Sequence, residues 1–144
     1  MIGSLYLAYY ATEISLHRCI IRSFRPDTTD DVLLRICRDA AKTRFLAVIS
    51  FIETLRPEHL RSFWYFCSST NFTLVAAYAA LLCATALDAD EVKYYEDMLN
   101  NYRWKLRVLQ IGIMDSAVAM LDATLPLLKP LNTRRLNLTS DRTT

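Results

Sequence analysis

The sequence predicts an all-α protein of about four to six packed helices, arranged as a helical array around a central apolar helix. Of its 144 residues 53% are apolar, which is enough to build the core of one ordinary domain. It contains only two glycines and four prolines, whereas a sheet protein needs many tight turns made from these residues. A long segment without charged residues, Ser62 to Leu87, supplies the central helix.

A first helix is predicted over residues 4–25, because Pro26 removes a backbone donor and ends it. One side of this helix carries apolar residues at helical spacing. The predicted buried residues are Leu5, Tyr9, Leu16 and Ile20.

A second helix is predicted from the cap-like pair Thr28 and Asp31 to about Leu55, since Arg56 precedes a proline. The predicted buried side holds Leu33, Ile36, Cys37, Ala40, Ala47 and Phe51. The predicted exposed side holds Arg35, Arg38, Asp39 and Lys42.

The uncharged segment at residues 62–87 is long enough to span a bilayer, which makes a small integral membrane protein the alternative hypothesis. A polar run at residues 68–71 interrupts the segment, and lipid offers no hydrogen-bond partners to such groups. We therefore favour two pieces, residues 58–67 and 71–87, buried among neighbouring helices.

Asp88 and Glu91 resemble a helix cap and predict a further helix. Its apolar residues recur every three or four positions, at Val92, Tyr95, Met98, Leu99, Tyr102, Leu106, Leu109 and Ile113. Arg103 and Arg107 are predicted to be solvated on the opposite face. After Pro126 the pattern decays, so residues 1–125 are predicted to form the helical domain and residues 126–144 a loose tail.

The sequence predicts no catalytic, metal-binding or DNA-binding residue, and no cofactor in this chain. The net charge of +2 comes from 17 basic and 15 acidic residues that are interspersed, which disfavours phosphate binding. No glycine-rich phosphate loop or nucleophile elbow occurs. Glu13 and His17 lie four residues apart, but two ligands are too few for a metal site. The four cysteines, Cys19, Cys37, Cys67 and Cys83, lack zinc-finger spacing and are predicted to be reduced and buried.

Three segments resemble the fungal-specific transcription factor domain, the middle homology region of fungal binuclear zinc-cluster transcription factors. They are LAYYATEISLHRCIIRS (Leu7–Ser23), LRPEHLRSFWYFCSSTNF (Leu55–Phe72) and YYEDMLNNYRWKLRV (Tyr94–Val108). The three blocks follow the order of the family, and the resemblance covers roughly residues 4 to 125. Regulators of nitrogen-source utilisation are the most similar subgroup.

The resemblance implies an all-helical regulatory module of a nuclear transcription regulator, which acts through helix packing and protein contact. Zinc and DNA readout belong in this family to a separate six-cysteine module, which this sequence lacks. DNA would then be reached only through a full-length relative. The front of the helical region is also missing relative to the family, so we expect a fragment or a short form that pairs with a relative. Uncovered apolar faces predict self-association, homo- or heteromeric.

The predicted core or partner anchors are large aromatic residues of the second and third resembling segments. They are Trp64, Tyr95, Tyr102 and Trp104. Tyr95 and Tyr102 belong to the predicted buried stripe, and for the two tryptophans a core position is favoured over an interface.

Overall fold

A computed structural model describes residues 2–25, 27–28, 30–60, 64, 67–109 and 112–140. Within these residues the predicted all-α class is confirmed, because every regular element is a helix. The elements are α1 (Ile2–Ser23), α2 (Asp31–Thr54), α3 (Pro57–Leu60), α4 (Ser68–Ala84), α5 (Ala89–Leu109), the 3₁₀ turn η1 (Gly112–Met114) and α6 (Asp115–Ser140).

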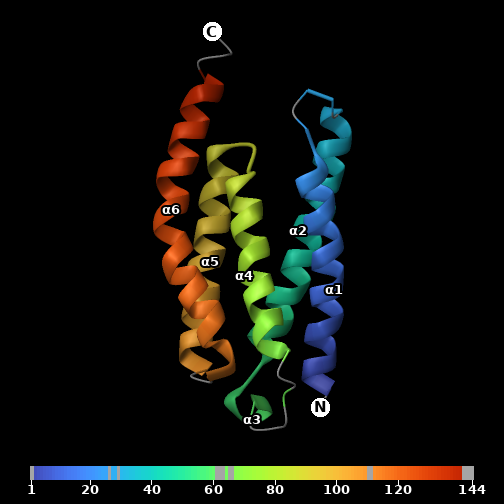
Figure 1. Cartoon of the computed structure of the whole chain (residues 1–144), viewed down its shortest axis with the longest axis vertical. Helices are drawn as coiled ribbons and strands as arrows, with labels where there is room; N and C mark the ends of the chain where they lie inside the picture. The colour runs from blue at the N-terminus through green and yellow to red at the C-terminus, as the bar shows by residue number, and fades with distance from the viewer. Residues whose placement is uncertain are drawn as a thin grey trace.

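Helix α4 lies at the centre of the bundle, as the uncharged segment predicted. The pair α1 and α2 packs on one side of it, and the pair α5 and α6 packs on the other (Figure 1). The side chains of Phe72, Val75, Tyr78 and Leu82 are fully buried in these contacts. Because α4 has apolar or small residues on all sides, it can be covered by both pairs at once.

The predicted start and buried stripe of α5 are confirmed. Asp88 Oδ1 accepts a hydrogen bond from the Glu91 N–H at 2.7 Å, and Glu91 Oε2 accepts one from the Leu87 N–H at 2.7 Å. These bonds satisfy backbone donors at the first turn, which otherwise lack a partner. The buried residues of the helix are Val92, Tyr95, Leu99, Tyr102, Leu106 and Leu109.

The predicted buried side of α1 is wrong. Leu5, Tyr9 and Leu16 are exposed, and the residues that enter the core come from the opposite side of the helix. These are Leu7, Ala11, Ile14 and Ile21. Both sides of α1 are apolar, so helical spacing identified a real stripe but not the stripe that α4 covers.

The predicted buried side of α2 is wrong in part, because Cys37, Ala47 and Phe51 are half-buried, whereas the other members of that side are exposed. Leu33 and Ile36 are exposed, although both were predicted to be buried. The buried residues are Arg38, Ala41, Phe45, Val48, Ile49 and Ile52. The N-cap is Asp30, whose carboxylate accepts from the Val32 N–H at 3.1 Å, rather than the predicted Thr28. The predicted end of the helix at Leu55 is confirmed.

The polar run at residues 68–71 opens α4 instead of separating two helices. The Asn71 N–H donates to the Cys67 carbonyl at 3.0 Å, so the run forms the first turn. Only the short α3 is described within the predicted piece at residues 58–67, and residues 61–63, 65 and 66 lie outside the described residues.

The tail that was predicted to be loose is helical as far as Ser140. Helix α6 continues through Pro126 and Pro130, both of which are exposed. Leu128 and Asn132 remain buried against the bundle beyond them. Burial of this apolar side offsets the backbone bonds that the two prolines remove. Residues 141–144 lie outside the described range.

Candidate interaction surfaces

Arg38 ties α2 to the start of α5, although the sequence placed it on the exposed side of α2. It is 4% exposed, and its guanidinium donates to Thr85 Oγ1 at 2.8 Å and to the Leu82 carbonyl at 3.3 Å. It also pairs with Glu91 Oε1 at 2.9 Å. Glu91 is therefore shared between the helix cap and a buried ion pair. The acidic cluster at residues 88–91 serves this junction, which is a structural role.

The position of Arg38 could have been read from its register. It precedes Ala41 and Phe45 by three and seven residues, so a helix that buries those two must bury Arg38 as well. A single charge in an otherwise apolar stripe is the signal, and it indicates a buried partner of opposite charge.

Two of the four predicted anchors, Tyr95 and Tyr102, belong to the core. The Tyr102 hydroxyl donates to the Phe72 carbonyl at 2.9 Å, and the Tyr95 ring packs on Phe45 with centroids 6.1 Å apart. Burial raises the pKa of both phenols above their ordinary value. Neither residue reaches a partner without unfolding, so their role as partner anchors is not available in this fold.

The two tryptophans differ. Trp64 is half-buried, donates from its indole nitrogen to the His59 carbonyl at 3.2 Å, and packs on Phe72. Trp104 is 66% exposed on α5, beside the exposed Val108. The favoured core position is thus wrong for Trp104. Of the four predicted anchors, Trp104 is the residue with its ring open to a partner.

Two arginines flank Trp104, and the sequence predicted them to be solvated. Arg103 pairs with Asp122 of α6 at 3.2 Å, and Arg107 contacts both oxygens of the same carboxylate at 2.8 and 2.9 Å. All three side chains are partly exposed, so the pairs contribute little to stability. They do hold α5 and α6 in register around the Trp104 surface.

The titratable candidates do not converge on one site. Glu13 accepts from the Tyr9 hydroxyl at 2.8 Å and pairs with Arg44 at 3.4 Å, instead of joining His17. No group of three His, Cys, Asp or Glu side chains in the described part of the chain is placed to hold a metal ion. The cysteines are dispersed over three elements and a loop, and of the four only Cys83 is fully buried. The prediction that all four cysteines are buried is therefore wrong, because Cys19 and Cys67 are exposed.

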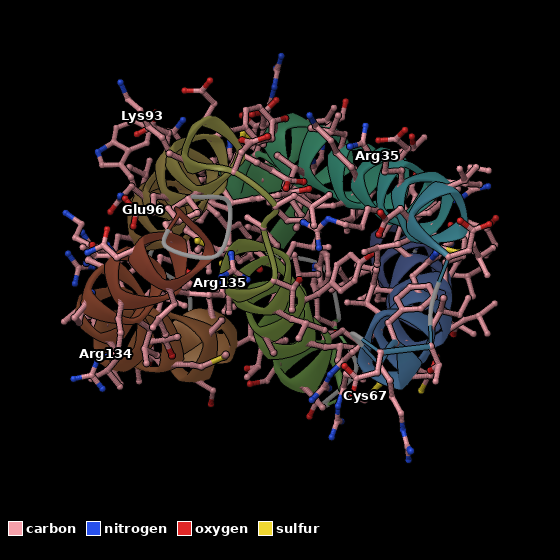
Figure 2. All side chains as sticks on the ribbon, turned by 90° about the horizontal axis from the view of Figure 1, so that it is seen from above. Arg35, Cys67, Lys93, Glu96, Arg134 and Arg135 are labelled. Carbon is pink, nitrogen blue, oxygen red and sulfur yellow. The ribbon has the colours of Figure 1, made fainter. Side chains whose placement is uncertain are left out.

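Cys83 and the end of α4 lie beneath α6. Burial raises the pKa of the Cys83 thiol, and Asn132 donates to its sulfur at 3.4 Å. Arg135 donates to the Ala84 and Ala86 carbonyls and so caps α4, while Arg134 points away from the bundle (Figure 2). An open cavity of about 370 Å³ between α5 and α6 is lined by Lys93, Glu96, Lys129 and Thr133 among others.

The membrane hypothesis gains no support from the helices. Among the residues that the structure describes, none of the helices combines the length and apolarity needed to cross a bilayer. Part of the predicted span, residues 62, 63, 65 and 66, lies outside that range. The polar first turn of α4 and its burial by four helices favour a core helix.

The described residues thus define an all-helical protein with an exposed tryptophan on α5. The chain is similar to the transcriptional activator protein DAL81 of Saccharomyces cerevisiae, with 45% identity over 106 residues. The match covers 74% of this chain and 11% of the activator, so the chain spans a small part of that relative. No protein-family profile and no solved structure matches the chain.

The predicted resemblance is confirmed by this match. The match fits a fragment of the fungal transcription factor region of this yeast zinc-cluster activator, which regulates nitrogen utilisation. The relative is a transcriptional activator, which fits a non-enzymatic reading of this chain.

Proposed function

We propose that this chain is a regulatory interaction module of a fungal transcription regulator, which works in the nucleus by binding a protein partner and catalyses no reaction. The observation that carries the proposal is the 45% identity to a transcriptional activator over 106 residues of the chain. Contact with DNA is then made by a full-length zinc-cluster relative and not by this chain.

Trp104 is the residue that we assign to partner binding. Exposed tryptophan is rare on surfaces and is enriched where binding energy concentrates. Its neighbour Val108 extends the apolar surface one turn further along α5. The Asp122 pairs with Arg103 and Arg107 border it, which gives the apolar centre and charged rim that protein interfaces share.

A reporter assay tests the role. The whole chain is fused to an unrelated DNA-binding domain, and transcription from a matching promoter is measured in yeast. We expect transcription to differ from that given by the DNA-binding domain alone, and the Trp104→Ala variant to abolish the difference. Leu127→Ala is the matched control, because Leu127 is an exposed apolar residue on another helix.

Transcription equal to that of the DNA-binding domain alone would refute the regulatory role. An effect that survives Trp104→Ala but depends on another surface would remove Trp104 from the proposal. Circular dichroism of both variants shows whether each retains the helical fold, so loss of function is separated from loss of structure.

A further inference from the structure

Two prolines divide helix α6 into a first part that belongs to the core and a last part that lies over the end of α4. Proline has no backbone N–H, so Pro126 leaves the Asp122 carbonyl without its helical donor. Pro130 does the same to the Pro126 carbonyl. Two successive turns of α6 therefore lack a backbone bond, and the helix is weakest where its two parts meet.

The two parts of α6 are anchored differently. Before Pro126, the buried core residues are Ala117, Leu121 and Leu125. Among residues 131–138, Asn132 is buried, Arg135 and Leu136 are half-buried, and the others are exposed. The last turns also extend beyond the connection between α4 and α5 (Figure 1). The last part thus buries little apolar surface, which is the main contribution that holds a helix to its neighbours.

Hydrogen bonds join the last part of α6 to the end of α4. Asn132 Nδ2 donates to the Cys83 sulfur at 3.4 Å. The Arg135 guanidinium donates to the Ala84 and Ala86 carbonyls. Water can bond the same donors and acceptors when they are exposed, so each bond makes only a small net contribution to the closed arrangement.

Contact between this part of α6 and α5 is incomplete. The open cavity of about 370 Å³ is lined by Val92 and Glu96 of α5 and by Thr133 and Leu136 of α6. Protein interiors are close-packed, so helices that face each other across such a space make few dispersion contacts there. The end of α6 can therefore leave α5 without breaking a packed interface.

Cys83 lies beneath the end of α6. Its side chain is fully buried, and its sulfur lies between the Asn132 amide and the Val92 carbonyl, which is 3.8 Å away. Burial raises the pKa of this thiol, so it is both covered and protonated in the closed arrangement. Its reaction with a thiol reagent therefore reports whether the end of α6 is in place.

We propose that residues 131–140, which we call the latch, detach from the end of α4 as a unit while the rest of the bundle stays folded. The closed latch caps the last carbonyls of α4 and covers Cys83, and the open latch exposes both to solvent. The core contacts of the other helices are the same in the two states, so the latch is a local two-state element. One end of the module can thus present two different surfaces to a partner. This inference goes beyond the proposed function and does not depend on it.

Alkylation of Cys83 by iodoacetamide tests the latch. The full chain is made with Cys19→Ser, Cys37→Ser and Cys67→Ser, so that Cys83 is the one remaining thiol. Labelling is followed by mass spectrometry at urea concentrations below the unfolding midpoint. We expect Cys83 to react about tenfold or more faster than global unfolding allows. The rate should hardly depend on urea, because opening a short segment exposes little surface.

A matched pair of arginine variants tests the contacts of the latch. Arg135→Met removes the bonds to the α4 carbonyls and should speed the labelling of Cys83 about tenfold. Arg134→Met is the control, because it removes the same charge from a side chain that points away from the bundle (Figure 2). It should leave the labelling rate unchanged.

A core variant separates opening of the latch from global unfolding. Ile14 is fully buried on α1, and Ile14→Val should raise the equilibrium constant of unfolding about fivefold. Its contacts are the same with the latch open or closed, so the labelling rate of Cys83 should not change.

Three outcomes would overturn the proposal. Labelling that Ile14→Val speeds by the same factor as unfolding would show that Cys83 reacts only from the unfolded chain. Equal acceleration by Arg134→Met and Arg135→Met would remove the α4 carbonyls from the mechanism. Labelling as fast as that of the unfolded chain in concentrated urea would show that no closed state forms. Circular dichroism shows that each variant keeps the helical fold. The transcription assay enters none of these outcomes, so failure of the latch and failure of the proposed function are distinguishable.

Discussion

Two buried tyrosines on the same side of α5 are expected to respond in opposite ways to loss of the hydroxyl. The Tyr102 hydroxyl donates to the Phe72 carbonyl at 2.9 Å, and Tyr102→Phe leaves that bond unmade. We expect a loss of about 1–1.5 kcal/mol in the free energy of unfolding. The Tyr95 hydroxyl is buried without a hydrogen-bond partner among the described residues. Tyr95→Phe removes a desolvated polar group, so we expect stability to be unchanged or to rise by up to about 1 kcal/mol.

Urea unfolding followed by circular dichroism measures the change in stability of both variants. Where the slope of the unfolding free energy against urea concentration is unchanged, the shift of the midpoint reports that change directly. The two substitutions remove the same atom from the same helix face, so each is the control for the other. Equal destabilisation by both would refute the reasoning, because it would show that the Tyr95 hydroxyl has a partner of equal strength. In the double variant, the two changes in the free energy of unfolding should add only if the two sites are independent.

The same phenols predict a loss of stability in alkali, and three further changes test other parts of the fold. Burial raises the pKa of Tyr78, Tyr95 and Tyr102 above the ordinary 10.0, so the unfolded chain loses these protons first. Below pH 10 the three protonated phenols contribute fully to the free energy of unfolding. Above pH 10 that free energy falls by up to about 1.4 kcal/mol per pH unit for each tyrosine. Urea midpoints across pH 8–11 measure this fall, and a flat profile would contradict it. Arg38→Met should cost about 2–3 kcal/mol by leaving Glu91 unpaired, and Glu91→Gln added to it should recover part of the loss in a thermal melt. Pro126→Ala should stabilise α6 by about 1–3 kcal/mol, since it restores a helical backbone donor at an exposed position, and a lower urea midpoint would show that α6 does not continue through this residue.

The ends of two helices followed from signals local to the chain. Asp88 and Glu91 marked the start of α5 because a cap is made by neighbouring residues, and no distant contact is needed to form it. Leu55 marked the end of α2 because the proline two residues on restricts the backbone before it. The stripe of α5 was read correctly because its apolar residues continue at helical spacing along the whole helix, whereas Trp104 and Val108 on the other side stand among polar residues. The similarity to transcription regulators was likewise legible in the residues themselves.

The inward side of α1 and α2 was decided by the tertiary structure. Leu16 and Ile14 are both apolar, and helical spacing gives no reason to bury one and expose the other. The choice depends on which side α4 covers, and α4 is far away in sequence. The partner of Arg38 was also decided by the packing, because Glu91 comes 53 residues later in the chain. The sequence therefore indicated most of the helical segments, although not the part of α6 beyond Pro126, and the class of protein that they form. Only the packing of these helices decided which of their apolar surfaces became core and which remained open to a partner, because burial is a property of neighbours that are brought together by folding.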